Sequence, residues 1–383
     1  MKLPTQAEQL AHSTDRAQLE ITERGKVIRV FVKTAARNWI TWFMMSTFGP
    51  YRNEINRYLN IELPVETPKV HCAKYSPSRF VLILEDLRAR ADVKLMTIWM
   101  EPECSVDLAK KILASMARIH GKYLGKPPAG VWNVQNRPYF GRITAGIAWH
   151  RCHTSICPGA VSDSIVRSFG AALWHWPTLR AAWDAARPQT LIHGDAHIGN
   201  VYLLERSSAE SVIGWFDFQV VGSEHPMRDV TYFLASSFPK SGLAQHEKDF
   251  IRFYLENLSA AVVEFETPCP VPTFDECWQQ YRLQSFYAMY AFAFSGGVGG
   301  NLQDRKQTRI LLERCAALME RVDAEGALVD LLRARGVSWA LHRYICVQIP
   351  APQAFSSAQD GGPQWSTLRT FTCECLPLTS KWD

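Results

Sequence analysis

The chain has 383 residues, of which 47% are hydrophobic and 21% are charged, and these proportions are typical of globular proteins. The 42 basic and 37 acidic residues leave a net charge of only +5, spread along the chain, which does not indicate a nucleic-acid-binding protein. We find no run of the ~18 apolar residues that a membrane span needs, and residues 1–18 lack the apolar core of a secretory signal. We therefore expect a cytoplasmic protein with neither a membrane nor a nucleic-acid partner, and with its ten scattered cysteines as free thiols.

The first predicted element is a β-hairpin over residues 17–33. Apolar residues alternate on both arms, and Arg24, Gly25 and Lys26 are typical of the turn. The second arm ends at Lys33. A short helix is expected over residues 51–59, followed by a strand at residues 81–84, whose four consecutive apolar residues indicate burial on both faces.

The middle of the chain is predicted to be mainly helical. Ser105 is expected to cap a helix over residues 106–123, because apolar residues recur there at helical spacing. Residues 131–158 are rich in aromatic, glycine and polar residues and are interpreted as loop and short helix. Two further helices are predicted at residues 161–174 and 177–186.

The most informative stretch is residues 191–200, Leu-Ile-His-Gly-Asp-Ala-His-Ile-Gly-Asn. Residues 201–204 and 211–216 then read as the two strands of a hairpin, which ends at Asp217. Such a hairpin places Asn200 beside Asp217, with Asp195 just in front of both. Two oxygen ligands can hold Mg²⁺ on a polyphosphate, and a free carboxylate can accept the proton of an attacking hydroxyl. The order His-x-Asp-x-x-x-x-Asn followed by Asp is the kinase pattern.

For the rest of the chain, the sequence pattern predicts helices followed by a tail. A helix is expected from residue 227 to 238, longer ones at residues 242–265, 273–295 and 303–322, and a last helix at residues 324–335. Residues 295–300 are glycine-rich but follow a helix rather than a strand, so we interpret them as a flexible connection and not as a phosphate loop. Residues 337–383 lose all periodicity, and low order is expected there.

The motif at residues 193–200 and the sequence Trp-Phe-Asp-Phe-Gln at residues 215–219 resemble the aminoglycoside phosphotransferase and choline kinase-like superfamily. Gln219, Gly194 and the stretch Leu84–Leu87 are most similar to its ecdysteroid-kinase-like (CHK kinase-like) branch. The resemblance covers roughly residues 13–336. It implies an α+β, two-lobed protein-kinase-like fold, with a small β-sheet lobe at residues 1–84, a hinge at 85–88 and a large, mainly helical lobe at 89–336.

The resemblance also implies roles for individual residues. Asp195 would be the catalytic residue, and Asn200 and Asp217 would bind Mg²⁺. Lys33 would bind the phosphates of ATP, with Arg29 and Arg37 as the alternatives to it. Glu54 would be the carboxylate partner of that lysine. The hinge residues Glu85 and Leu87 would contact adenine through their backbone. His193 and Asp229 would support the catalytic loop.

One departure from the family pattern concerns the glycine-rich loop that covers the phosphates. The only glycine before Lys33 is Gly25, which we place in the hairpin turn. Residues 12–16 resemble the end of that loop in relatives, so the small lobe is expected to lack its first strands. The main prediction is transfer of the γ-phosphoryl group of ATP to a hydroxyl of a small molecule. The alternative is a catalytically inactive pseudokinase that binds nucleotide or acts as a scaffold. An aminoglycoside-modifying enzyme is less favoured, because residues 131–158 are not notably acidic.

Overall fold

A four-stranded antiparallel sheet begins the fold. The structure is a computed structural model that describes residues 14–23, 26–76, 79–96, 104–131, 138–206, 211–297 and 303–337. The predicted hairpin forms from β1 (Thr14–Glu23) and β2 (Lys26–Ala35), with Glu23 opposite Lys26. Two further strands, β3 (Val70–Ser76) and β4 (Arg79–Glu85), complete the order β1-β2-β4-β3. The predicted strand at residues 81–84 therefore lies inside the sheet, between β2 and β3.

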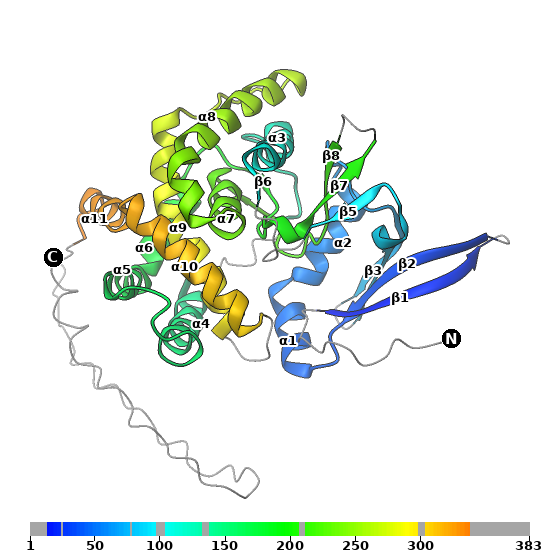
Figure 1. Cartoon of the computed structure of the whole chain (residues 1–383), viewed down its shortest axis with the longest axis horizontal. Helices are drawn as coiled ribbons and strands as arrows, with labels where there is room; N and C mark the ends of the chain where they lie inside the picture. Colours follow the sequence, from blue (N-terminus) through cyan, green and yellow to red (C-terminus); the bar gives the residue numbers. More distant parts are fainter. Residues whose placement is uncertain are drawn as a thin grey trace, which may run out of the picture. The chain divides into compact units, whose positions relative to one another are not determined.

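Two helices pack on this sheet. The first, α1 (Trp39–Phe48), was not predicted, whereas α2 (Pro50–Asn60) matches the predicted short helix. Gly49 joins them with φ 87°, a left-handed conformation that glycine adopts without strain. Tyr51 of α2 stacks on Phe80 of β4 with their ring centroids 4.6 Å apart. The sheet and α2 thus share a small core of their own (Figure 1), formed by Tyr51, Ile55, Phe80, Leu82 and Leu84.

Short strands link the first sheet to the predicted catalytic hairpin. After β4 the chain makes a 3₁₀ turn, η1 (Leu87–Ala89), and then β5 (Val93–Leu95). β5 pairs with β7 (Val201–Glu205), which pairs with β8 (Ser211–Trp215). Nearby, β6 (Thr190–Ile192) pairs with β9 (Gly222–Glu224). These two small sheets hold residues 193–200 and 216–221 between them.

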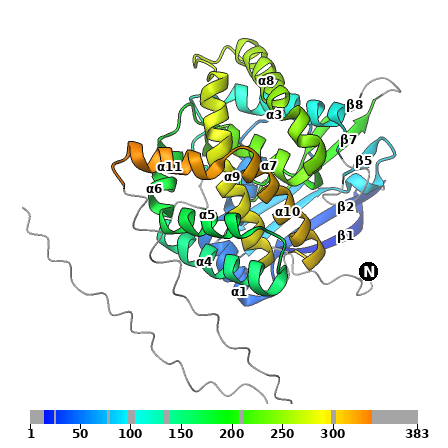
Figure 2. The ribbon, with the colours of Figure 1, turned by 60° about the vertical axis from the view of Figure 1, so that its left-hand side comes forward.

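The larger lobe is mainly helical. Its helices are α3 (Val106–Lys122), α4 (Pro138–Arg151), α5 (Asp163–Trp174), α6 (Trp176–Ala185), α7 (Met227–Ser237), α8 (Lys240–Glu264), α9 (Phe274–Gly297), α10 (Arg305–Arg321) and α11 (Ala324–Ala334). Long helix α9 packs against α4, α7 and α10 (Figure 2). In the part of the chain that the structure describes, we find no helix both long enough and apolar enough to span a membrane.

The predicted fold class is confirmed: an N-terminal sheet lobe precedes a helical lobe. The cap of α3 is also confirmed, since Ser105 Oγ accepts the backbone N–H of Leu108 at 3.2 Å. Two predictions were wrong in part. Where loop and a short helix were expected, the 14-residue helix α4 and a π-helical turn (Cys152–Ile156) form, with Ala148, Trp149 and Cys152 buried on the side that packs against α9. Helix α9 runs through Gly297, where a flexible connection was expected, and residues 298–300 of that connection lie outside the described residues. Residues 338–383 of the predicted tail lie outside the described residues.

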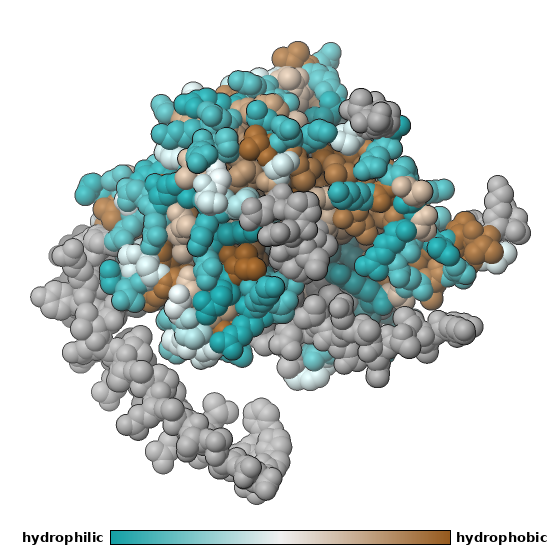
Figure 3. All heavy atoms as spheres, in the orientation of Figure 1, coloured by the Kyte–Doolittle hydropathy of each residue, from teal (hydrophilic) through white to brown (hydrophobic). Residues whose placement is uncertain are grey.

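The core of the sheet lobe generates a test of its packing. Leu82 is fully buried, so Leu82→Ala should lower the free energy of unfolding by about 2–5 kcal/mol, through lost burial and the cavity left behind. Chemical denaturation measures this change. The matched control is Val27→Ala, because Val27 is 65% exposed near the tip of the β1–β2 hairpin, where apolar surface is visible in Figure 3. Equal losses in both variants would contradict the assignment of this core.

Candidate functional site

The loop after β6 is held in a conformation that needs glycine. Gly194 has φ 83°, and a Cβ added there would lie 2.1 Å from the carbonyl oxygen of Val220. The buried carboxylate of Asp229, on α7, accepts the backbone N–H of His193 at 2.6 Å and that of Gly194 at 2.9 Å. Asp229 also lies 3.2 Å from His120 Nε2. The carboxylate therefore anchors the loop just before Asp195.

His193 joins this loop to the segment that contains Asp217. Its Nδ1 accepts the backbone N–H of Asp195 at 3.3 Å, so its Nε2 carries the proton and donates to the carbonyl of Phe216 at 3.0 Å. Burial lowers the pKa of His193, which favours this neutral form. The His193 imidazole thus links the backbone of Asp195 to the backbone of Phe216.

Asp195 accepts hydrogen bonds from several sides. Tyr232 Oη of α7 donates to Oδ1 at 2.8 Å, and Asn200 Nδ2 donates to Oδ2 at 3.3 Å. His197 Nε2 lies 3.5 Å from the same Oδ2. Burial alone would raise the pKa of Asp195, but the neighbouring His197 and the hydrogen bond from Tyr232 together hold it well below its ordinary value. The carboxylate remains about one-third exposed, so a ligand can reach it in its ionised form.

The predicted hairpin brings Asn200 and Asp217 together. Val201 pairs with Trp215 in the β7–β8 register, and the Phe216 backbone N–H donates to the Asn200 carbonyl at 3.1 Å. Asn200 is therefore opposite Phe216, one residue before Asp217. Asp217 has φ 65°, in the left-handed region, which turns the chain sharply at the end of the hairpin.

Asp217 belongs to a cluster of four charged side chains, with Lys33, Glu54 and Arg16. Lys33 Nζ donates to Glu54 Oε1 at 2.7 Å and to Asp217 Oδ1 at 2.9 Å, while Arg16 Nη2 lies 3.3 Å from Asp217 Oδ2. Lys33 and Glu54 are buried. Burial raises the pKa of Glu54, although the Lys33 ammonium opposes this shift. Burial alone would also raise the pKa of Asp217, but Lys33 and Arg16 hold that pKa below its ordinary value. Of the alternatives to Lys33, Arg29 pairs with Glu20 and Arg37 with Asp15, and both arginines are exposed.

Helix α2 fixes Glu54 relative to the segment that follows Asp217. Asn53 Nδ2 donates to the carbonyl of Val221 at 3.0 Å, and the Arg57 guanidinium lies over the Phe218 ring, 3.9 Å from its centroid. Both side chains are buried, and burial lowers the pKa of Arg57 to about 10. The helix that positions Lys33 thus contacts the segment that carries Asp217.

The two residues predicted for the hinge, Glu85 and Leu87, have different surroundings. Glu85 ends β4, and its carboxylate accepts the Lys69 N–H at 2.9 Å and pairs with Arg90. Leu87 is buried against Tyr202 and Leu204. The backbone N–H of Glu85 also has a partner, the Lys69 carbonyl at 2.9 Å, so a contact of Glu85 with a nucleotide stays a prediction that the structure does not test.

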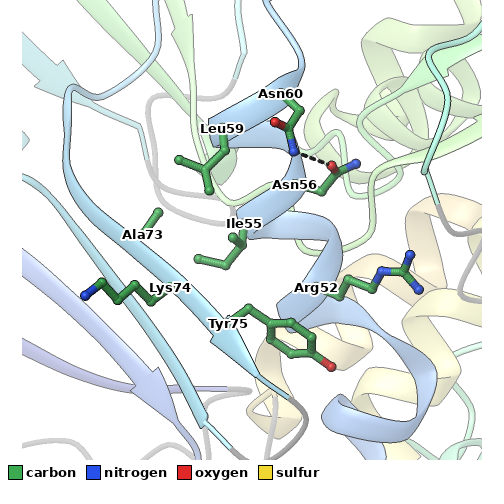
Figure 4. Close-up of a pocket in the computed structure, with 8 residues that line it drawn as sticks. All are labelled: Arg52, Ile55, Asn56, Leu59, Asn60, Ala73, Lys74 and Tyr75. Carbon is green, nitrogen blue, oxygen red and sulfur yellow. Dashed lines mark hydrogen bonds between the residues drawn. The ribbon is translucent and has the colours of Figure 1, made fainter.

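A shallow groove of about 490 Å³ lies elsewhere on the sheet lobe (Figure 4). It runs between α2 and β3 and is lined by Arg52, Ile55, Asn56, Leu59, Asn60, Ala73, Lys74 and Tyr75. None of the predicted site residues lines it. The charged junction at Asp217, rather than this groove, is therefore the candidate site.

The structure brings six predicted residues together in one site: Lys33, Glu54, His193, Asp195, Asn200 and Asp217. Sequence reasoning assigned no role to Arg16 beyond its place in residues 12–16, which resemble the end of the glycine-rich loop, and it did not identify His197 or Tyr232. His197 lies within the motif itself, two residues after Asp195. Tyr232 follows Asp229 by three residues on α7, a spacing that places both on the same face of the helix.

Comparison with known proteins adds a family match. Residues 180–265 match the ecdysteroid kinase-like family. The matched stretch contains both the catalytic-loop motif and Asp217, so the resemblance predicted from the sequence is confirmed over these residues. No curated protein matches the chain.

Solved structures with a similar arrangement are distant in sequence. The ethanolamine kinase of Plasmodium vivax is 10% identical, with a TM-score of 0.42, over 85% of this chain and 83% of its own. The choline kinase of Cryptosporidium parvum is 10% identical, with a TM-score of 0.43, over 87% and 93%. An aminoglycoside 2'-phosphotransferase-IIIa in complex with GDP is 13% identical, with a TM-score of 0.44, over 80% and 92%.

The anchoring of the loop by Asp229 generates a stability prediction. Asp229→Ala leaves the N–H groups of His193 and Gly194 buried without their acceptor, which should lower the free energy of unfolding by about 2–5 kcal/mol. Denaturant titration followed by circular dichroism measures the loss. Asp249→Ala is the control, because Asp249 forms an exposed pair with Arg252 and should cost less than about 1 kcal/mol. A loss at Asp229 no larger than at Asp249 would contradict this anchoring role.

Proposed function

We propose that the protein is a phosphotransferase that moves the γ-phosphoryl group of ATP to a hydroxyl group of a small molecule. The observation that carries this proposal is the buried Lys33, which bridges Glu54 and Asp217 close to Asn200 and Asp195. A lysine held by a glutamate beside a metal-binding aspartate is the arrangement with which kinases bind the phosphates of ATP. The family match over residues 180–265 supports the same reaction class.

The chemistry of Asn200 and Asp217 fits Mg²⁺. One amide and one carboxylate are hard oxygen donors, and Mg²⁺ commonly takes one or two protein ligands while phosphates and water complete its octahedral shell. Asn200 uses its amide nitrogen toward Asp195, so its amide oxygen is the atom available to a cation. Bound there, Mg²⁺ would neutralise charge on the β- and γ-phosphates.

The role proposed for Asp195 follows from its hydrogen bonds. Its lowered pKa keeps the carboxylate ionised at neutral pH, so it would accept a hydrogen bond from the acceptor hydroxyl and orient that oxygen toward the γ-phosphorus. As the new P–O bond forms and the bond to the β-phosphate oxygen breaks, the hydroxyl proton passes to Asp195. Positioning and charge neutralisation provide most of the rate, because the transition state is loose.

A second candidate function is a pseudokinase that binds nucleotide without transferring phosphate. The observation that favours it is the composition of β1, residues Thr14–Glu23, which contains no glycine and so cannot supply a glycine-rich phosphate loop. Against it stand Lys33, Asp195, Asn200 and Asp217, the complete set of charged and amide groups that the reaction needs.

One experiment separates the two candidates. The purified protein is incubated with Mg·ATP and a library of alcohols, and mass spectrometry searches for an acceptor heavier by one phosphate. A thermal-shift titration with Mg·ATP accompanies it. A phosphorylated product supports the transferase, whereas nucleotide binding without any product contradicts it and supports the pseudokinase.

Removal of the proposed catalytic carboxylate should abolish turnover while leaving the fold intact. Asp195→Asn keeps the shape of the side chain but removes the charge that accepts the proton, so kcat should fall by at least about 100-fold. Steady-state kinetics on the acceptor found by the screen measures this. Asp330→Asn, at an exposed pair with Arg333, should leave kcat unchanged. Full activity of the Asp195 variant would refute the assignment.

Tyr232 should act through the position of Asp195. Tyr232→Phe removes the 2.8 Å hydrogen bond to Oδ1. We expect kcat to fall about 10-fold with an unchanged KM for ATP, since Tyr232 contacts the carboxylate that is proposed to orient the acceptor hydroxyl. The matched control is Tyr254→Phe, which removes an equally buried hydroxyl from His120. If the two variants affect kcat equally, Tyr232 has no specific role in positioning Asp195.

A further inference from the structure

Arg16 occupies a place in the site that no predicted role accounts for. In the β1–β2 register Arg16 lies directly opposite Lys33, and directly paired residues of antiparallel strands project from the same face of the sheet. Both cations reach the same carboxylate, Lys33 at Oδ1 of Asp217 and Arg16 at Oδ2. Two adjacent strands therefore direct two positive charges at one point.

The four side chains of this cluster balance in charge, since Lys33 and Arg16 carry two positive charges and Glu54 and Asp217 carry two negative charges. The ionised Asp195 adds one negative charge nearby. A divalent cation on Asp217 would displace the two side chains that neutralise it and would leave an excess of positive charge. A polyphosphate arriving with the cation restores the balance, because it gives both displaced side chains a new anionic partner.

The two cations differ in how easily they can change partner. Lys33 is buried and is held by Glu54 as well as by Asp217. Arg16 is about one-third exposed, and apart from Asp217 its guanidinium contacts the neutral hydroxyl of Thr14, 3.4 Å from Nε. Among the residues that the structure describes, Arg16 pairs with no carboxylate besides Asp217, so its side chain can leave Asp217 without breaking a second ion pair there.

We propose that Arg16 is a phosphate-binding residue that takes over the task of a glycine-rich loop. When the metal and nucleotide bind, its guanidinium leaves Asp217 Oδ2 and holds the terminal phosphates. The planar guanidinium can donate two parallel hydrogen bonds to one phosphate. It would thus supply donors in place of a glycine-rich turn, which β1 does not contain. This inference rests on the proposed function, because it assigns Arg16 to the nucleotide of that same site.

The test compares nucleotides that differ in phosphate number. Isothermal titration with a non-hydrolysable ATP analogue, ADP and adenosine, each with Mg²⁺, is done on the wild type and on Arg16→Gln. We expect the variant to bind the ATP analogue about 10- to 100-fold more weakly, with adenosine affinity unchanged. Arg16→Lys should recover only part of the loss, because an ammonium cannot form the bidentate contact. Arg29→Gln removes an exposed ion pair with Glu20 from the same hairpin and should change nothing.

The outcomes separate this inference from the proposed function. If the wild-type protein binds none of these nucleotides, the proposed function fails and the role of Arg16 fails with it. If the wild type binds the ATP analogue and Arg16→Gln binds it equally well, only the inference is overturned. An equal loss for adenosine and for the ATP analogue also overturns it, because Arg16 would then support the site without contacting phosphate. If Arg16→Gln does not fold, the same comparison is made with Arg16→Lys, where an affinity equal to that of wild type overturns the inference.

Discussion

The site depends on the burial of one positive charge. Lys33 is almost completely shielded from water, and an isolated ammonium in such a place would be strongly destabilising. Glu54 and Asp217 make its burial possible, and they come from two distant parts of the chain, α2 and the segment after β8. Because all three charges must be present together, this ion-pair network ties β2 and α2 to the segment that carries Asp217.

Further contacts reinforce the same connection. Asn53 and Arg57 join α2 to the residues just after Asp217, and His193 joins Asp195 to the residue just before it. Asp229 holds the loop that precedes Asp195. Helix α2 thus contacts the segment that follows Asp217 through a hydrogen bond and a cation–π contact as well as through the ion pairs of Lys33.

The parts of the fold and site that could be predicted from the sequence are those determined by local spacing. The hairpin after Asn200 has a turn of polar residues between apolar strands, which is enough to bring Asn200 and Asp217 together. Arg16 could not be found in the same way. The predicted three-residue turn at residues 24–26 would place residue 17 opposite Lys33. In the structure Glu23 pairs with Lys26, and this register places Arg16 opposite Lys33 instead. A shift of one residue in register reverses the face from which a side chain projects. Likewise, the length of α4 was underestimated, since only loop and a short helix were predicted there; its packing partner α9 is far away in the sequence.

The most direct test of the account is a crystal structure with a non-hydrolysable ATP analogue and Mn²⁺, whose anomalous signal locates the metal. The account predicts one metal about 2.0–2.2 Å from oxygens of both Asn200 and Asp217, the distance expected of a small divalent cation. Lys33 should contact the phosphates, and Asp195 should face the γ-phosphorus across an open space. A nucleotide bound away from Asp217, or a metal that contacts neither Asn200 nor Asp217, would contradict the account.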